Sequence, residues 1–441
     1  MITDYQAKYF AHELTRRFPP DSVEKITVAF AGAQVDLNPH QTRTEAIAYG
    51  DKAVFCLEKL PRSEASQRKI IDARCNLSKY YTILNWHVEA KEVVDPIKDL
   101  AHKIGYKKSF PVINGAIGSY YVLAEGDMLK GTEHLLEAVE ASESIGDDFS
   151  LLSAIITLGS ACAWNCEFDK ALSYFDQAMT SSVAENNPNW VAWTKWTIGP
   201  VYWSQGKLDT AYQMGEEVLN TGTATGNIVI IVAARFHLGF VCYFKGFHNE
   251  AERHLLSAFN DAERIGLSVL ASMCSEILGD AYHALGQSEE PRRWYSKGIS
   301  LGERHKTHPW LTNLCRMKLA REAFAEDDRD IDIGKIIEYR KGIKVKSIEG
   351  QSARVVADIL MNLHDPHWSE AKDWIKRAIE ADKNNGMRWE LGRDYALYAE
   401  LFKRKGDLPK AREQLTKAID IMKECGADGW VTRYEEELVM L

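Results

Sequence analysis

Small and large apolar residues recur along the chain with helical spacing, in blocks that repeat every 40 residues. Four blocks align throughout: residues 156–178, 196–218, 236–258 and 276–298. Each has a glycine directly after a leucine or an isoleucine, at Gly159, Gly199, Gly239 and Gly279. Twelve residues later the blocks have Ala171, Ala211, Ala251 and, as the exception, Pro291. A fixed period of this length predicts a stack of two-helix units.

The same spacing continues in both directions from these four blocks. Backwards it reaches Gly118 and Ser78, and forwards it reaches Leu319, Ile359 and Ala399, the last followed by Ala411. Only the step from 118 to 159 departs from 40, by one residue. We therefore expect eight units with both halves, preceded by a degenerate helix around residues 45–60.

Two copies match a known repeat signature, which has a large apolar residue and a small one in the first helix, then Ala, an aromatic or large residue, and Ala in the second. The best copies are Leu158, Gly159, Ala171, Phe175 and Ala178, and Tyr398, Ala399, Ala411, Leu415 and Ala418. The chain thus resembles the tetratricopeptide repeat (TPR) family over about 380 residues, although its period of 40 exceeds the usual period of about 34. The longer form is similar to repeat regions that bacteria fuse to nucleotide cyclases, signalling ATPases and transcription activators.

The resemblance implies an all-α fold, a right-handed superhelical solenoid of antiparallel helix hairpins. The spacing has a physical reason, because small residues at both sites let two helices approach closely while larger residues fill the groove to the next hairpin. The expected turns carry Gly, Asn or Asp near a helix end, at residues 125–127, 165–169, 204–209, 244–250 and 404–410.

Three parts are expected along the chain. Residues 42–428 form the superhelix, with weaker units around 308–385, and residues 429–441 form a C-terminal capping helix. Residues 1–41 lie outside the repeat and read as two helices, 5–17 and 21–34, separated by FPPD. They resemble the leader of bacterial superfamily-two helicases of the chromatin-remodeller type, but no GxxxxGK[ST] loop follows. We interpret them as an N-terminal cap or docking segment, with a nucleic-acid element as the alternative.

Composition narrows the environment and the partners. A net charge of −9 and a pI near 5.9 argue against a broad nucleic-acid-binding surface. The N-terminus lacks an apolar secretion signal, and no run approaches the roughly 20 apolar residues that cross a membrane. The eight cysteines are scattered without a CxxC pair, as in a reduced protein. We expect a cytoplasmic protein without a membrane anchor.

No motif indicates catalysis. The sequence contains no GxSxG, no GxGxxG and no phosphate loop, and its histidine pairs lack a third metal ligand at suitable spacing. We therefore expect no enzymatic activity, no cofactor and no metal. The acidic run 325–334 is interpreted as a long turn, with a hinge or a divalent-cation site as the alternative.

Aromatic residues gather on the first helices of two adjacent units. Relative to Gly199 and Gly239, the expected concave positions are occupied by Trp193, Trp196, Pro200 and Trp203, and by Phe236, Phe240 and Tyr243. Positions spaced by 3, 4 and 7 share one helix face, so the rings would project together. In the next unit the corresponding positions are polar and include Asp280 and His283. The alternative is that the rings only pack between helices.

These observations predict a non-catalytic scaffold or regulatory module that binds a protein or peptide in its concave groove. The aromatic side chains would anchor the ligand, and charged residues would form the rim. The alternative is a regulatory domain that senses a small molecule in the same groove and controls a separate effector. The oligomeric state is left open by the sequence.

Overall fold

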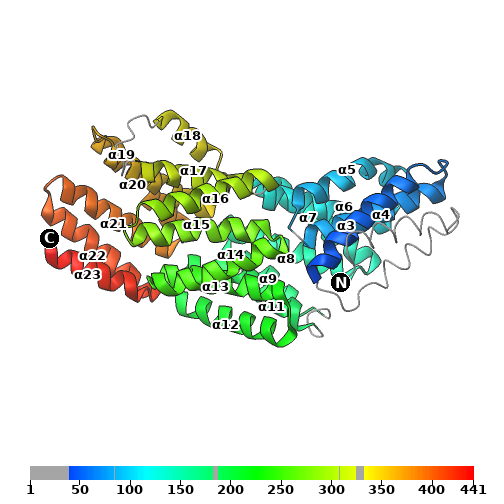
Figure 1. Cartoon of the computed structure of the whole chain (residues 1–441), viewed down its shortest axis with the longest axis horizontal. Coiled ribbons are helices and arrows are strands. Elements are labelled where there is room, and N and C mark those ends of the chain that lie inside the picture. Colours follow the sequence, from blue (N-terminus) through cyan, green and yellow to red (C-terminus); the bar gives the residue numbers. More distant parts are fainter. Residues whose placement is uncertain (1–38, 84, 182–186, 307, 324–331) are drawn as a thin grey trace.

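The computed structural model describes residues 39–83, 85–181, 187–306, 308–323 and 332–441. The helices expected at 5–17 and 21–34, and most of the acidic run 325–334, lie outside these residues. The described part is built from helices without a strand, and successive helices run antiparallel to form an elongated array (Figure 1). The predicted all-α solenoid of helix hairpins is therefore confirmed.

The array consists of paired helices between one preceding helix and one following helix. The preceding helix is α3 (Pro39–Leu57) and the following helix is α23 (Asp428–Met440). The hairpins are α4 (Glu64–Ile83) with α5 (His87–Lys103), α6 (Phe110–Ser119) with α7 (Met128–Ile145), α8 (Asp148–Trp164) with α9 (Phe168–Met179), α11 (Pro188–Ser204) with α12 (Leu208–Thr225), α13 (Ile228–Lys245) with α14 (His248–Ile265), α15 (Ser268–Ala284) with α16 (Glu289–His305), α17 (Pro309–Ala323) with α18 (Ile333–Lys341), α19 (Glu349–Asn362) with α20 (Trp368–Asn384), and α21 (Arg388–Arg404) with α22 (Leu408–Cys425). Short turns of other helix types are η2 (Lys107–Ser109), η3 (Tyr120–Glu125) and η5 (Lys346–Ile348).

Many helices end next to a residue with a positive φ, which is usually glycine. These residues recur at intervals of 20 positions, half of the repeat period. Residues with a positive φ occur at Gly126, Gly146, Cys166, Gly206, Gly226, Gly246, Gly266, Gly286, Lys306, Gly386, Gly406 and Gly426. A residue in the left-handed region ends a helix and satisfies its last carbonyls, and glycine adopts it without steric cost. In the α7, α12, α13, α14, α15, α21 and α22 segments, the end of the helix is thus specified by a glycine in this conformation.

Glycines in the first helices allow close helix packing. A Cβ atom on Gly159 would lie 2.6 Å from the Phe175 ring, and one on Gly239 would lie 2.6 Å from Leu255, in each case on the second helix of the same hairpin. Gly199 differs, because its Cβ would lie 2.3 Å from His237 in the first helix of the next hairpin. The small residue there governs the packing between units.

The one-residue departure from the 40-residue period lies in a π-helical turn. Gly159 precedes its turn residue Cys166 by seven positions, whereas Gly118 precedes Gly126 by eight. Between Gly118 and Gly126 the chain forms the π-helical segment η3, and a π turn accommodates one more residue than an α turn. The insertion is therefore absorbed inside the helix, and the following hairpins resume the period.

The C-terminal units fold back onto the tips of the central hairpins. The indole Nε1 of Trp389 donates to the Phe244 carbonyl at 2.7 Å, and that of Trp430 donates to the Tyr243 carbonyl at 3.0 Å. Phe244 and Trp389 stack with ring centroids 3.8 Å apart. We call this set of contacts, between the end of α13 and helices α21 and α23, the return contact; it closes part of the curve of the array (Figure 1).

Helix α13 forms the centre of the described array. By length and composition alone it could cross a membrane, yet 72% of its apolar window is buried inside the folded chain. Phe236, His237, Leu238 and Gly239 are all buried. Such a helix is apolar on all sides because neighbouring helices surround it.

A pair of glycine substitutions tests the return contact. Gly146 and Gly246 both have a positive φ, but a Cβ on Gly146 meets nothing within 4 Å, whereas one on Gly246 lies 2.6 Å from the Trp430 amide nitrogen. Gly146→Ala should cost about 1 kcal/mol of stability through backbone strain, and Gly246→Ala should cost about 3 kcal/mol through strain and overpacking. Urea unfolding measures both, and equal losses would contradict the described packing.

Candidate functional site

A cavity of about 500 Å³ lies on the inner side of the first helices. Its walls come from α6, α8, α11, α13 and α15, which are first helices of five successive hairpins. Since first helices of stacked hairpins lie next to one another, the walls are brought together by the repeat itself. The cavity size falls within the range of roughly 300–1,000 Å³ that is usual for ligand pockets.

The structure places most of the sequence-selected aromatic residues on this cavity. Trp193, Trp196, Pro200 and Trp203 of α11 and Phe236 of α13 line it. The rings of Trp193 and Trp196 are 4.8 Å apart and form part of one wall. Helix α11 continues through Pro200, which removes the backbone donor that would otherwise pair with the Trp196 carbonyl. Their role in binding stays a prediction.

Two selected aromatic residues lie elsewhere. Phe240 packs between Trp203 and Phe244, with ring centroids 4.6 Å from each. Tyr243 is buried in the return contact, where Arg393 donates to its hydroxyl at 3.3 Å. The cavity and the return contact therefore occupy opposite ends of the same aromatic face.

The cavity has further aromatic walls that the sequence analysis did not select. Phe149 and Trp164 line it from the two ends of α8, and Trp190 lines it from the start of α11. Phe149 and Trp190 meet edge to face with centroids 5.5 Å apart. A search for the same offsets around Gly159 would have reached Ile156, Ser160 and Ala163, which also line the cavity. The aromatic residues at the helix ends lie outside those offsets.

Two buried histidines also line the cavity. His87 begins α5 and His308 directly precedes α17, so they bring together units that are distant in sequence. Burial lowers the pKa of His87 to about 4 and, with the nearby His87 ring, that of His308 to about 3. Both rings are therefore neutral at pH 7. Among the described residues, the Nδ1 atom of each has no hydrogen-bond partner.

Small polar side chains complete the lining. Asn187 and Asn227 cap α11 and α13, and their Oδ1 atoms accept backbone amides at 3.1–3.4 Å. Thr157 and Ser160 donate to carbonyls of their own helix at 2.9 and 3.1 Å. Their hydroxyl oxygens keep lone pairs that can accept a further hydrogen bond.

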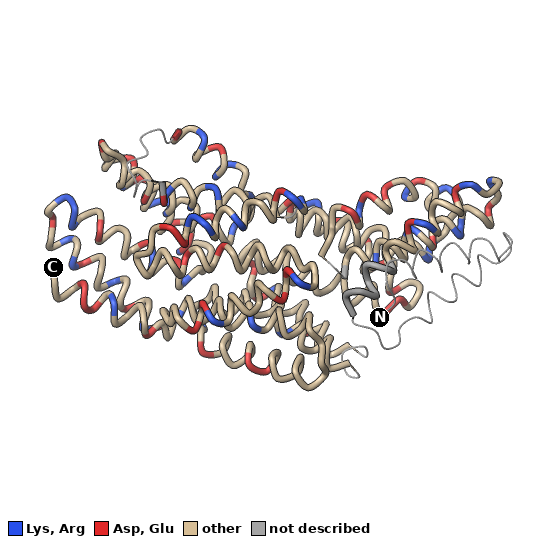
Figure 2. Tube along the Cα trace, viewed as in Figure 1, with Lys and Arg blue, Asp and Glu red and all other residues tan. Residues whose placement is uncertain are grey.

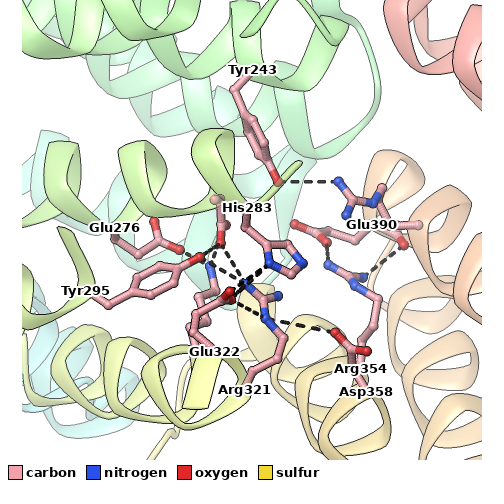
Figure 3. Close-up of polar contacts among 12 residues, drawn as sticks. Tyr243, Glu276, His283, Tyr295, Arg321, Glu322, Arg354, Asp358 and Glu390 are labelled. Carbon is pink, nitrogen blue, oxygen red and sulfur yellow. Dashed lines mark hydrogen bonds and ion pairs between the residues drawn. The ribbon is translucent and has the colours of Figure 1, made fainter. Parts of the chain in front are cut away.

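Asp280 belongs to a buried network of polar and charged side chains, and His283 contacts this network from a half-buried position (Figure 3). Lys318 is 1% exposed and donates to Asp280 at 2.5 Å and also to Glu276. The Tyr295 hydroxyl donates to Asp280 at 2.6 Å, and His283 lies 3.0 Å from Glu322. These residues come from α15, α16 and α17, so the network holds two hairpins together.

The pKa values of the two carboxyl groups around Lys318 move in opposite directions. Burial alone would raise the pKa of Asp280, but the charges of Lys318 and Arg321 lower it overall. Burial raises the pKa of Glu276 to about 7 in spite of Lys318. We conclude that Asp280 is the ionised partner of the Lys318 ammonium group and that Glu276 is partly protonated near neutral pH.

A second buried cluster lies on α19, α20 and α21. Arg354 donates to Asp394 at 2.7 Å and also to Glu390 (Figure 3 shows Arg354 and Glu390). Burial and the neighbouring Asp394 and Glu390 charges raise the pKa of Asp382 well above the usual value, and a hydrogen bond with Asp394 raises it further. Asp382 is thus the neutral member of the cluster.

The described residues contain no group of three or more His, Cys, Asp or Glu side chains that could hold a metal ion. Among them, the eight cysteines are free thiols, and Cys56 alone is exposed. Apart from the ammonium group of Lys79, the cavity lining offers aromatic rings, hydroxyls, amides and neutral imidazoles.

No protein-family description matches the chain, and no curated protein sequence matches it either. The fold has solved counterparts. The crystal structure of NprR in complex with its cognate peptide NprX has a TM-score of 0.56 and 14% identity, covering 81% of this chain and 98% of that one. The Rap conjugation gene regulator of plasmid pLS20, in complex with the Phr* peptide, has a TM-score of 0.55 and 13% identity, covering 83% and 95%. At such identities the likeness concerns the fold, a TPR-like array of helices.

Removing the Lys318 cation tests whether it compensates the buried Glu276 and Asp280 carboxyl groups. Lys318→Met would leave Glu276 and Asp280 buried without their cation, at a cost of about 3–5 kcal/mol in the free energy of unfolding. The stranded carboxyls then have raised pKa values in the folded state, so the variant should regain stability as the pH falls from 7 to 5.

The matched control is the triple variant Lys318→Met, Glu276→Gln and Asp280→Asn, which removes all three charges. It should recover most of the lost stability and show no such pH dependence. Denaturant unfolding at pH 5 and pH 7 measures both variants. A single variant as stable as the parent at pH 7 would contradict the described network.

Proposed function

We propose that this protein is a non-catalytic regulatory scaffold that binds a short peptide in the cavity on the inner side of its first helices. The observation that carries the proposal is the cavity itself, about 500 Å³ in volume and walled by aromatic side chains from adjacent hairpins. Rigid aromatic side chains in a preformed pocket bury much area at little entropic cost, and such residues dominate binding energy.

The lining also suits a peptide backbone. Asn227 holds its helix cap through its oxygen, and its NH₂ group donates to no acceptor in the described part of the chain. Thr157 and Ser160 offer acceptors, and the Nε1 of Trp196 is a buried donor without a described partner. A peptide backbone presents alternating N–H and C=O groups, which need such partners when they leave water.

The solved counterparts support a peptide over other ligands. The two solved structures described above, with TM-scores of 0.56 and 0.55, contain the peptides NprX and Phr*. Both proteins have the same helical-repeat architecture. The one that binds Phr* is named a conjugation gene regulator. From these proteins we take only the class of ligand, a peptide. We infer that a bound peptide changes how this chain contacts a separate effector protein. We place both partners in the cytoplasm.

The second candidate is a sensor for a small molecule, favoured by two buried histidines of the cavity lining. His87 and His308 are buried there, and each has an unsatisfied ring nitrogen among the described residues. A compact ligand could satisfy them without leaving the cavity. The two candidates differ in whether a main chain or a single compact molecule fills the space.

Filling the cavity tests the proposal without damaging the fold. A Cβ added at Gly115 would meet only the Ala138 Cβ, at 4.0 Å, and Gly115 lines the cavity. Gly115→Leu should therefore occupy ligand space, and it should raise helix stability by about 0.5–1 kcal/mol because glycine is a poor helix former.

Peptides that co-purify with the chain, identified by mass spectrometry and resynthesised, provide the ligand for calorimetry. We expect Gly115→Leu to weaken their binding by at least about tenfold, equivalent to about 1.4 kcal/mol, while the melting temperature stays equal or rises. Ala141→Leu, at a half-buried position of α7 that does not line the cavity, is the control. Peptide binding that survives Gly115→Leu would place the site elsewhere, and a bound metabolite in place of a peptide would favour the second candidate.

A further inference from the structure

The cavity lining is nearly free of charge in a highly charged chain. Charged residues make up 27% of the sequence, so about nine would be expected among 35 lining residues, yet Lys79 is the one such residue in the described lining. Helices α8 and α11, which form its centre, carry one charged residue each, Asp148 and Lys195. Neither of them lines the cavity. Figure 2 shows the charged positions spread along the remaining helices.

The titratable groups of the lining keep this neutrality at pH 7. His87 and His308 are each 5% exposed, and burial favours their uncharged form. Lys79 remains 35% exposed and lies 4.0 Å from Asp147, which also accepts from the Ser150 amide at the start of α8. The one charge of the lining is therefore at a hydrated position beside a carboxylate.

A charge that enters this cavity loses water, and Lys79 is the one described lining residue that could act as its counter-ion. Burying an unpaired carboxylate or ammonium group is strongly unfavourable, whereas a neutral polar group needs only a hydrogen-bond partner. The described lining has no carboxylate to pair with a cation, and an anion could reach only Lys79. Elsewhere in the chain, buried charges such as Lys318 are paired.

We propose that the cavity selects an uncharged segment, made of aromatic, aliphatic and neutral hydrogen-bonding side chains, and rejects segments that insert Lys, Arg, Asp or Glu. This rests on the proposed peptide-binding function and adds the ligand's chemical class. Its neutral polar groups would meet the free acceptors of α8 and the imidazoles of His87 and His308. Specificity arises from the penalty on the wrong ligand as much as from contacts with the right one.

The test uses a library of acetylated and amidated hexapeptides in two pools. One pool contains only uncharged residues, and the other has a single Lys or Glu at each position in turn. The immobilised full chain captures peptides, and mass spectrometry identifies them. Calorimetry then compares the tightest uncharged peptide with its single-Lys and single-Glu analogues, and we expect analogues at inserted positions to bind about 100-fold more weakly.

A carboxylate placed in the wall should reduce the preference for the uncharged peptide over its Lys analogue. Thr157 lines the cavity and Thr223 lies on the exposed face of α12, and each hydroxyl donates to the carbonyl four residues earlier. Thr157→Glu should weaken the uncharged peptide and shift the ratio of affinities toward its Lys analogue by at least about tenfold. Thr223→Glu, the matched control, should leave the ratio unchanged.

The outcomes separate the two proposals. Capture of charged peptides as often as uncharged ones, with no shift in Thr157→Glu, overturns the inference while peptide binding stands. If neither pool binds, the peptide proposal fails, and naphthylacetamide, naphthylmethylamine and naphthylacetate then test the charge rule alone. Preference for the neutral amide keeps the inference, and its absence overturns it. The wild-type comparisons decide the matter even if Thr157→Glu does not fold.

Discussion

The close approach of two antiparallel helices at a small residue is the constraint on which this molecule depends. At Gly159, Gly239 and Gly279 the second helix or its ring lies where a Cβ would stand. This spacing sets the depth to which these hairpins nest, and left-handed residues at 206, 226, 246, 266, 286 and 306 fix where the helices of the central hairpins end. The first helices then line one side, and the cavity follows from their stacking.

Periodicity made the fold predictable, because each repeat sees the same neighbours. It also placed Trp193, Trp196, Pro200, Trp203 and Phe236 on one face, since helical spacing alone determines which residues share a face. Local pattern could not place Tyr243, because its surroundings come from Trp389 and Trp430, about 145 and 187 residues away. The lining histidine His308 depends in the same way on curvature summed over several units. The π turn had a visible signal, the extra residue between Gly118 and Gly126.

The fold contains one region where charged side chains are buried in pairs and another where the buried polar groups are uncharged. Where α15, α17, α19 and α21 meet, acids and bases are buried in pairs and hold the units in register. Where α6, α8, α11 and α13 enclose space, charged side chains are almost absent. The first arrangement pairs most of its charges internally. The second leaves hydroxyls, amides and imidazoles without full sets of partners, and a ligand can complete them.

The return contact changes how such an array assembles. Most helical repeat proteins form contacts between neighbours only and can begin folding at any unit. Here the aromatic tip of α13 receives its final covering from residues made much later on the ribosome. Until then Tyr243 and Phe244 expose apolar surface on the nascent chain. This surface favours aggregation until α21 and α23 have folded onto it.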